Sequence, residues 1–162
     1  MNGIIKYFVI LFLLIFQSCI SQEKKETKSN ATMKYEVQKT DAEWKNQLGE
    51  ERFRILRLKG TEFPHTGEYN LYFEKGTYVC GGCGEQLFKS DSKFKSECGW
   101  PSFDEAIPGK VEYKKDNSAG MQRTEILCAK CGGHLGHVFD DGPTKTGTRY
   151  CVNSLSIDFK KE

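Results

Sequence analysis

The sequence predicts a small, mainly β domain with antiparallel strands and short N-terminal helices, and three observations carry this prediction. From Gly76 onward, short strand-like runs are separated by Gly, Pro, Asn and Asp, the pattern of strands joined by turns. Before them, Thr40 and Glu43 have the capping-box spacing that begins a helix. Two Cys-x-x-Cys pairs, at 80–83 and 128–131, lie among the strand-like runs. A chain of 162 residues is long enough for one such domain but not comfortably for two.

Composition indicates a globular domain with an ordinary soluble surface, since 38% of the residues are hydrophobic and 28% are charged. The net charge is +2, and acidic and basic residues are interspersed along the chain. A nucleic-acid-binding surface normally shows a clustered basic stripe. We therefore expect no nucleic-acid partner. Nothing in the sequence suggests an obligate dimer, so we expect a monomer.

Residues 1–18 are predicted to be a signal peptide of the lipoprotein type. Lys6 precedes ten apolar residues, 7–16, a run that matches a signal-peptide core and is too short to span a bilayer. Ser18 then places a small residue directly before Cys19. This junction resembles a bacterial lipoprotein signal, in which Cys19 is lipidated and becomes the mature N-terminus. A plain cleaved signal or an uncleaved short anchor is the alternative.

The polar and charged residues that follow show no apolar periodicity, so we expect 19–40 to be the lipidated cysteine and a disordered tether. The folded domain then spans 41–162. With this organisation the protein is expected in the cell envelope, held at the membrane by its lipid and facing the periplasm or the exterior.

The elements of the domain follow in order. Gly49 interrupts the predicted helix, so two short helices or one kinked helix are expected, and a turn-rich segment, 61–70, comes next. The runs 110–115 and 121–128 flank Asp-Asn-Ser-Ala-Gly and predict a β-hairpin. The segment 149–159 predicts a final strand. The period of two places Arg149, Cys151 and Asn153 on one face, which continues as Leu155, Ile157 and Phe159.

The two Cys-x-x-Cys pairs predict a closed metal site. Four thiolates at this spacing supply the tetrahedral ligand set of a structural zinc ion and leave no position open for water. The glycines after each pair suit a zinc knuckle. Three disulfides among the six domain cysteines are the alternative in an exported protein, but Cys-x-x-Cys is more often a metal knuckle or a redox pair. We therefore expect one structural Zn²⁺ per chain, held by Cys80, Cys83, Cys128 and Cys131.

Two cysteines remain in the domain, Cys98 and Cys151, and they are 53 positions apart. A stabilising disulfide is one reading of this pair. However, Arg149 lies on the same strand face as Cys151, where it would favour a nucleophilic thiolate. Cys98 is followed by Gly-Trp-Pro, a loop-forming sequence that can expose an aromatic ring. A reactive thiol and a mobile second thiol suit a reaction that ends in a disulfide.

His134 and His137 stand three residues apart in a glycine-rich segment directly after the second cysteine pair. Since four thiolates already satisfy zinc, proton transfer near neutral pH is the role we expect for this pair. Asp140 and Asp141 either orient an imidazole or cap a turn.

These segments resemble the signatures of a known family. The sequences CGWPSF at 98–103, GHLGHVFDDGP at 133–143 and RYCVNS at 149–154 are similar to those of methionine-R-sulfoxide reductases (MsrB). The cysteine pairs lie where the zinc-binding, two-cysteine members carry theirs, and 61–69 resembles the family's substrate-side segment. The resemblance covers 41–160 and implies a small antiparallel β fold with short N-terminal helices.

The resemblance also implies site roles and an activity, the reduction of peptide methionine (R)-S-oxide. Cys151 is the implied nucleophile, which releases methionine and becomes a sulfenic acid, and Cys98 is the implied resolving cysteine. The other implied active-site residues are His134, His137, Arg149 and Asn153, with Trp100 and Phe139 against the substrate methyl group.

An exported reductase of this kind needs an exported thioredoxin-like reductant, and its partner is oxidised protein methionine. Two other functions fit parts of the sequence. A zinc-ribbon interaction module explains the metal cysteines but leaves Cys98, Cys151 and both histidines without a role. A general thiol–disulfide oxidoreductase uses Cys98 and Cys151 and would act on disulfide substrates without any sulfoxide.

Overall fold

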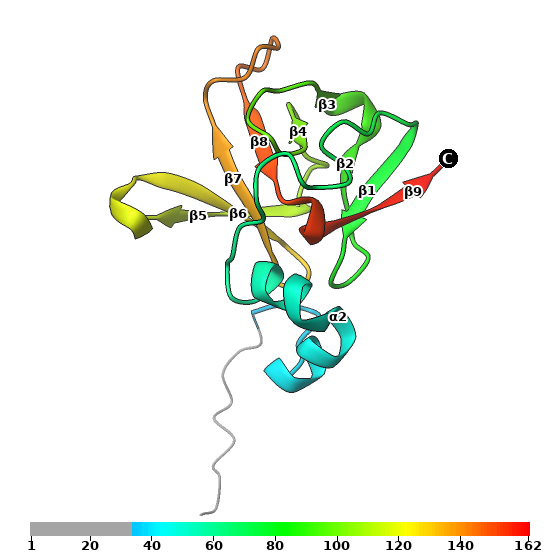
Figure 1. Cartoon of the computed structure of the whole chain (residues 1–162), viewed down its shortest axis with the longest axis vertical. Helices are drawn as coiled ribbons and strands as arrows, with labels where there is room; N and C mark the ends of the chain where they lie inside the picture. The colour runs from blue at the N-terminus through cyan, green and yellow to red at the C-terminus, as the bar shows by residue number, and fades with distance from the viewer. Residues whose placement is uncertain (1–33) are drawn as a thin grey trace, which may run out of the picture. The chain divides into compact units, whose positions relative to one another are not determined.

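The computed structural model describes residues 34–162, and this part of the chain contains one α-helix, three 3₁₀ turns and nine strands (Figure 1). The helical elements are α2 (Asp41–Leu56), η1 (Ser90–Ser92), η2 (Ser118–Gly120) and η3 (Ser154–Ser156). The strands are β1 (Gly76–Cys80), β2 (Gln86–Lys89), β3 (Lys93–Phe94), β4 (Ser102–Phe103), β5 (Val111–Asp116), β6 (Arg123–Cys128), β7 (His134–Phe139), β8 (Arg149–Val152) and β9 (Ile157–Lys161).

The strands form two sheets, and the prediction of a mainly β, antiparallel domain is confirmed. One sheet has the order β2-β1-β9 and the other the order β3-β4-β8-β7-β6-β5. All neighbouring strands in both sheets are antiparallel. In Figure 1 the β5–β6 hairpin projects to one side of the domain, while β7 and β8 lie nearer its centre.

Aromatic side chains from both sheets form the core. Phe88 of the three-stranded sheet stacks on Phe103 of the six-stranded sheet, with ring centroids 4.4 Å apart. Tyr78 meets the same Phe103 ring edge-on at 5.0 Å. Each of these three side chains is fully buried, and burying a large apolar side chain contributes about 1.5–3 kcal/mol. This packing holds β4, the short strand that follows the Cys98 loop, against the three-stranded sheet, and β4 pairs with β8, which carries Cys151.

The predicted N-terminal helices form a single kinked element, α2. The Thr40 side chain accepts a hydrogen bond from the Glu43 N–H, and the Glu43 side chain accepts from the Thr40 N–H, so the predicted capping box is present. Gly49 has non-helical angles (φ 73°, ψ 171°) and breaks the helix as expected. The residues that α2 buries in the core are Trp44, Phe53, Ile55 and Leu56.

The predicted hairpin is confirmed as β5 and β6. Six pairs run in register from Val111 opposite Cys128 to Asp116 opposite Arg123. Strand β6 then pairs with β7, which places Glu125 opposite His137. The hairpin therefore brings charged side chains of β5 and β6 to the strand that carries both predicted site histidines.

The prediction of one continuous strand over 149–159 is wrong. Strand β8 ends, the turn η3 follows, and β9 joins the other sheet beside β1. The cause is Glu62, whose buried carboxylate accepts hydrogen bonds from the N–H groups of Ser154 (2.6 Å) and Leu155 (3.0 Å). These amides are consequently turned away from any continuing ladder, and the chain crosses between the sheets.

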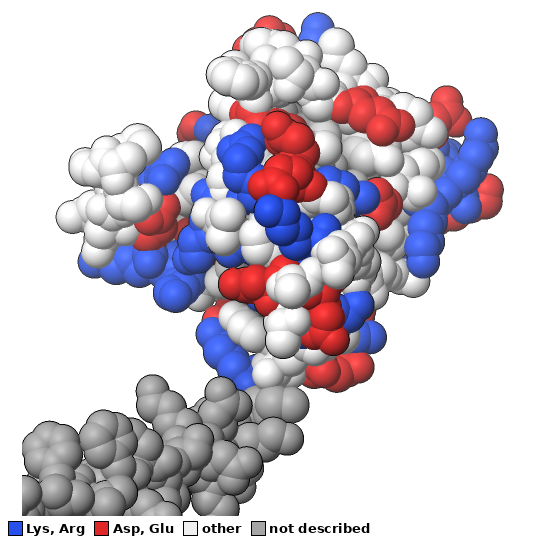
Figure 2. Space-filling model, turned by 60° about the horizontal axis from the view of Figure 1, so that its bottom comes forward, with Lys and Arg blue, Asp and Glu red and all other residues white. Residues whose placement is uncertain are grey.

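The predicted signal peptide, Cys19 and most of the predicted tether lie outside the described residues. Within 34–162, no helix combines the length and the apolar character that a membrane crossing requires. The last part of the predicted tether packs on the domain, because the Val37 N–H donates to the Lys130 carbonyl (3.1 Å). On the face shown in Figure 2, acidic and basic side chains are interspersed.

Candidate active site

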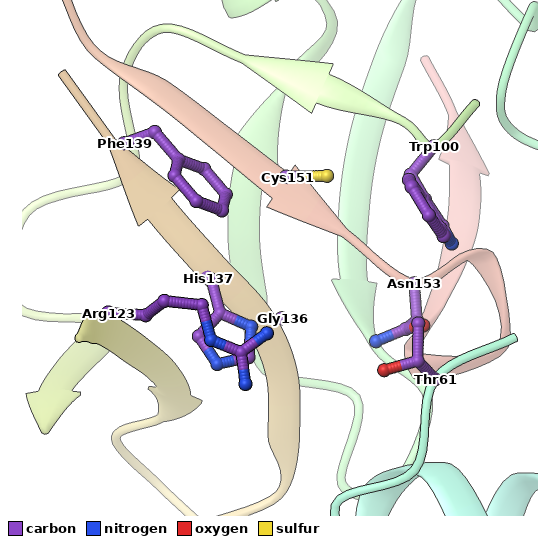
Figure 3. A pocket seen from close by; sticks show the side chains of 8 residues that line it. All are labelled: Thr61, Trp100, Arg123, Gly136, His137, Phe139, Cys151 and Asn153. Atoms are coloured by element: carbon purple, nitrogen blue, oxygen red, sulfur yellow. The ribbon is translucent and has the colours of Figure 1, made fainter. Parts of the chain in front are cut away.

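A pocket opens on the six-stranded sheet where β6, β7 and β8 lie side by side (Figure 3). Five of the predicted site residues line it, together with three others that the sequence did not indicate. The lining residues are Thr61, Trp100, Arg123, Gly136, His137, Phe139, Cys151 and Asn153. In Figure 3, Trp100 and Phe139 lie on opposite sides of Cys151. One sulfur atom therefore faces a cavity with aromatic walls.

Strand register brings these side chains together. Strand β7 pairs with β8 so that His137 lies opposite Cys151 and Phe139 lies opposite Arg149. The strands approach closely at Gly136, where a Cβ atom would overlap the carbonyl oxygen of Cys151. Only glycine fits there without displacing β8. The pocket floor thus depends on Gly136, because only a residue without a side chain fits there.

Cys98 lies directly beside Cys151, and their Sγ atoms are 3.6 Å apart. A disulfide bond is about 2.05 Å long, so the two sulfurs are in contact but not bonded. Cys98 comes from the loop before β4, where Gly99 has a φ of +91°. The N–H of Val152 donates to the Pro101 carbonyl (3.0 Å), which ties this loop to β8. The structure therefore brings together the two cysteines that the sequence separates by 53 positions.

The two thiols titrate as a pair. A hydrogen bond from Cys151 lowers the pKa of Cys98 to about 4. The same contact, with burial, raises the pKa of Cys151, while the Arg149 guanidinium acts in the opposite direction. One proton therefore leaves the pair far more easily than it leaves an isolated thiol, and the second leaves with difficulty. Only the Cys151 member of the pair lines the pocket.

Arg149 is held beside the thiol pair by an aspartate and an aromatic ring. Its Nε and Nη2 atoms each donate to a carboxylate oxygen of Asp141, both at 2.8 Å. Its guanidinium carbon lies 4.5 Å from the centre of the Phe139 ring. This bidentate pair lowers the pKa of Asp141. Asp141 thus orients the arginine. This role is neither of the two that the sequence left open for Asp141, which were to orient an imidazole or to cap a turn.

Each of the two site histidines has its own carboxylate. The Nδ1 atom of His134 lies 2.8 Å from Glu125, and the other oxygen of Glu125 accepts from the Lys59 amine (2.6 Å). The Nε2 atom of His137 lies 2.8 Å from Asp116. His134 is 2% exposed, and its burial lowers its pKa against the opposing effect of Glu125. Between the two, only His137 reaches the pocket wall.

The segment 61–67 crosses the rim of the pocket and holds two of its walls. The Trp100 ring N–H donates to the Glu62 carbonyl (3.3 Å), and the Glu62 N–H donates to the Asn153 side-chain oxygen (3.1 Å). A third bond runs from the His65 N–H to the Gly99 carbonyl (2.8 Å). We call this segment the strap. It fixes Trp100 and Asn153 relative to one another across the sheet edge.

The four predicted metal cysteines converge at one point, where the ends of β1 and β6 meet. Their sulfur atoms all lie within 4.8 Å of one another, with Cys80 3.7 Å from Cys131 and Cys83 3.6 Å from Cys128. Four thiolates about 2.3 Å from a central ion form a tetrahedron with edges of about 3.8 Å. The spacing therefore fits a metal ion. It excludes disulfide bonds within this cluster in the structure.

The backbone around these cysteines suits the same interpretation. The Gly82 N–H points at the Cys80 sulfur (3.4 Å), as in a metal knuckle. Gly84 and Gly132 have φ values of +74° and +69° and close the two turns by donating to the carbonyls of Cys80 and Cys128. The prediction that four cysteines form one closed, metal-capable site is confirmed.

The chain was compared with known proteins. The model of the SelR domain matches residues 48–161. The chain belongs to the methionine-R-sulfoxide reductase (MsrB) family. Peptide methionine sulfoxide reductase MsrB of Leptospira interrogans is 58% identical over 131 residues, which cover 80% of this chain and 100% of that relative. The MsrB proteins of Variovorax paradoxus (54% over 132 residues, 78% and 97% covered) and Methanosarcina barkeri (53% over 129 residues, 78% and 89% covered) are also similar.

Membership in the MsrB family makes this chain an enzyme of methionine sulfoxide reduction. A zinc-ribbon module that only binds a partner is therefore set aside. Sequence reasoning missed Glu62, Asp116, Arg123 and Glu125. All are charged residues whose contacts depend on strand register and chain crossing, which local spacing does not reveal.

Proposed function

We propose that this chain reduces the R epimer of methionine sulfoxide in oxidised proteins, with Cys151 as the nucleophile. The observation that carries the proposal is the placement of the two thiols. Cys151 faces the pocket, and the Cys98 sulfur stands 3.6 Å from it. The first can attack a substrate, and the second is already in position to close a disulfide.

In the first step the Cys151 sulfur attacks the sulfoxide sulfur, and the sulfoxide oxygen takes up a proton. The substrate sulfur is reduced by two electrons and leaves as methionine, and the Cys151 sulfur is oxidised by two electrons to a sulfenic acid. In the second step the Cys98 thiol attacks that sulfenic acid, so that an S–S bond forms and water leaves. A dithiol donor of the thioredoxin type then reduces the disulfide by thiol–disulfide exchange.

The remaining pocket residues supply binding and protons. Trp100 and Phe139 offer aromatic faces to the S-methyl group, with which thioethers make favourable contacts. Arg149 favours a thiolate at the cysteine pair. His137 is the imidazole that reaches the pocket, and we assign it the proton transfer to the sulfoxide oxygen. His134 stands behind it, with ring centroids 5.6 Å apart.

The test compares the wild-type chain with Cys151→Ser and Cys98→Ser on peptides that contain R or S methionine sulfoxide. With excess dithiol, the wild type should release methionine from the R epimer only, and Cys151→Ser should release none. Without dithiol, Cys98→Ser should release about one methionine per chain and retain a sulfenic acid that dimedone traps. Turnover of disulfide substrates without any sulfoxide, and none of the sulfoxide, would identify a general thiol–disulfide oxidoreductase instead.

We also propose that the four-cysteine site holds a structural Zn²⁺. The donor set supports this, because four thiolates complete a tetrahedral shell and leave no place for water or substrate. Such an ion ties the end of β1 to the end of β6 and takes no part in the redox step. Metal analysis of the purified protein should give one zinc per chain. A chelator that removes it should unfold the domain, and a metal-free protein that stays folded and active would contradict this role.

The location of the enzyme is the last part of the proposal. The apolar run 7–16 and the small residue before Cys19 support export as a lipoprotein, and an exported thioredoxin-like protein is then the reductant. Mass spectrometry of the mature N-terminus should find a diacylglycerol-modified Cys19, and Cys19→Ala should release the protein from membranes. An unmodified full-length N-terminus in the cell would overturn the lipoprotein assignment.

A further inference from the structure

The carboxylate of Asp116 lies directly against the pocket histidine. Its Oδ2 atom is 2.8 Å from His137 Nε2, and the two side chains are 15% and 13% exposed. Asp116 ends β5, two strands away from β7, so only the hairpin brings it to this place. It lines no part of the pocket itself. Any influence that it has on the reaction must therefore act through a pocket residue that it contacts, His137 or Arg123.

Asp116 is held firmly by its own hairpin. The Ser118 N–H donates to Oδ1 (2.9 Å), and Arg123 Nη2 donates to Oδ2 (2.8 Å). Arg123 is the residue opposite Asp116 in the β5–β6 register. The Ser118 bonds, the His137 contact and the Arg123 charge together hold the pKa of Asp116 well below its usual range. A carboxylate anchored in this way has one orientation and a permanent negative charge.

This contact decides which ring nitrogen of His137 can serve the reaction. Because Nε2 faces a carboxylate, it carries the proton that is donated to Asp116, and Nδ1 is the nitrogen that remains for another partner. His134 is bound the opposite way, through Nδ1 to Glu125.

We propose that Asp116 is a positioning residue for His137 in the reduction, an inference that rests on the proposed function. It fixes the ring orientation and the tautomer of the imidazole. Arg123 and Ser118 keep Asp116 in place, so the β5–β6 hairpin is part of the proton-transfer machinery and not only the edge of a sheet.

Other charged groups also lie around His137, and they too affect how kcat depends on pH. They come from the strands packed on either side of β7 and from β7 itself. The groups that face or adjoin the ring are Asp116, Arg123, Glu125, His134 and Cys151. Asp116→Asn removes one carboxylate from both His137 and Arg123, and its effect on His137 is identified by the ring N–H resonance of that residue.

The first test measures kcat and KM against pH for three variants with a peptide R-sulfoxide and excess dithiol. Asp116→Asn removes the charge, Asp116→Glu keeps it, and Asp158→Asn is the control. Asp158 also pairs with an arginine, Arg52 Nη2 at 3.0 Å, but it lies in β9 of the other sheet. Asp116→Asn should lower kcat about 10- to 100-fold with little change in KM.

Asp116→Glu should recover part of the lost rate, and Asp158→Asn should match the wild type. A kcat for Asp116→Asn within twofold of the control would overturn the proposal. So would a fall in kcat that Asp116→Glu does not reduce, since that is the mark of a structural effect alone.

A second readout needs no turnover and separates this inference from the proposed function. In the wild type, the ring N–H of His137 that donates to a carboxylate should give a downfield proton resonance, assigned by its absence in His137→Asn. It should move upfield in Asp116→Asn and stay in place in Asp158→Asn. If the wild type failed to reduce sulfoxides but showed this resonance, the activity assignment would fail and the pairing would stand. A resonance unaffected by Asp116→Asn would refute the pairing itself.

Discussion

Replacing Glu62 tests whether a buried carboxylate on the strap ends β8 and holds the pocket together. Glu62 is 5% exposed, and its two oxygens accept from the N–H groups of Ser154 and Leu155. Glu62→Ala leaves both amides without a partner. Each unsatisfied buried donor costs about 1–3 kcal/mol, or about 2–6 kcal/mol together.

Part of this loss is offset, because burying the carboxylate is itself unfavourable. Burial raises the pKa of Glu62 against the opposing effect of its amide donors. We therefore expect Glu62→Ala to lower the free energy of unfolding by about 2–4 kcal/mol. Glu62→Gln retains one acceptor oxygen and should lose about half as much. Activity should fall further than stability predicts, since the strap also holds Trp100 and Asn153.

The assay is equilibrium urea unfolding of metal-loaded protein, followed by the fluorescence of the buried Trp44. Glu68→Ala is the matched control, since Glu68 is an exposed glutamate six residues along, where a substitution should change stability by less than about 0.5 kcal/mol. If Glu62→Ala unfolded at the same urea concentration as Glu68→Ala, the carboxylate would not be what terminates β8, and the account of the strap would be wrong.

Two further substitutions test a buried lysine and the close approach of β7 to β8. Lys93 is 9% exposed, and burial lowers its pKa from the unfolded value of 10.5 to about 8. Between pH 8 and 10.5 the folded chain has therefore lost a proton that the unfolded chain still binds. Because of this difference, wild-type stability should rise by about 3 kcal/mol over that range relative to Lys93→Met. Parallel stability curves for the two proteins in urea titrations would contradict this. Gly136→Ala should push β8 away at Cys151 and lower kcat/KM at least about 10-fold. A variant with wild-type kcat/KM would show that β8 can move without loss of activity.

Local spacing was sufficient to predict the parts of this molecule that are encoded locally. The capping box, the β5–β6 hairpin and the metal cysteines each depend on residues a few positions apart, and all three are confirmed. The break in 149–159 could not be predicted in the same way. The segment alternates like a strand, and what ends the strand is a glutamate more than ninety positions earlier in the chain.

The residues of the candidate site also differ in whether the local sequence predicts them. Cys151, His137 and Phe139 are on adjoining strands, and the sequence already marked them. The carboxylates behind the histidines, Glu125 and Asp116, were not found, because their partners follow from the register of β5, β6 and β7.

The distance between the two pocket sulfurs bears on how long the enzyme survives the oxidants whose damage it repairs. A sulfenic acid that waits in solution is exposed to a second oxidation, to a sulfinic acid that ordinary thiols do not reverse. With Cys98 3.6 Å from Cys151, the competing thiol is present at a very high effective concentration. Peroxide at cellular levels is far more dilute. In the proposed mechanism, this geometry limits the lifetime of the sulfenic acid and so protects the enzyme from overoxidation.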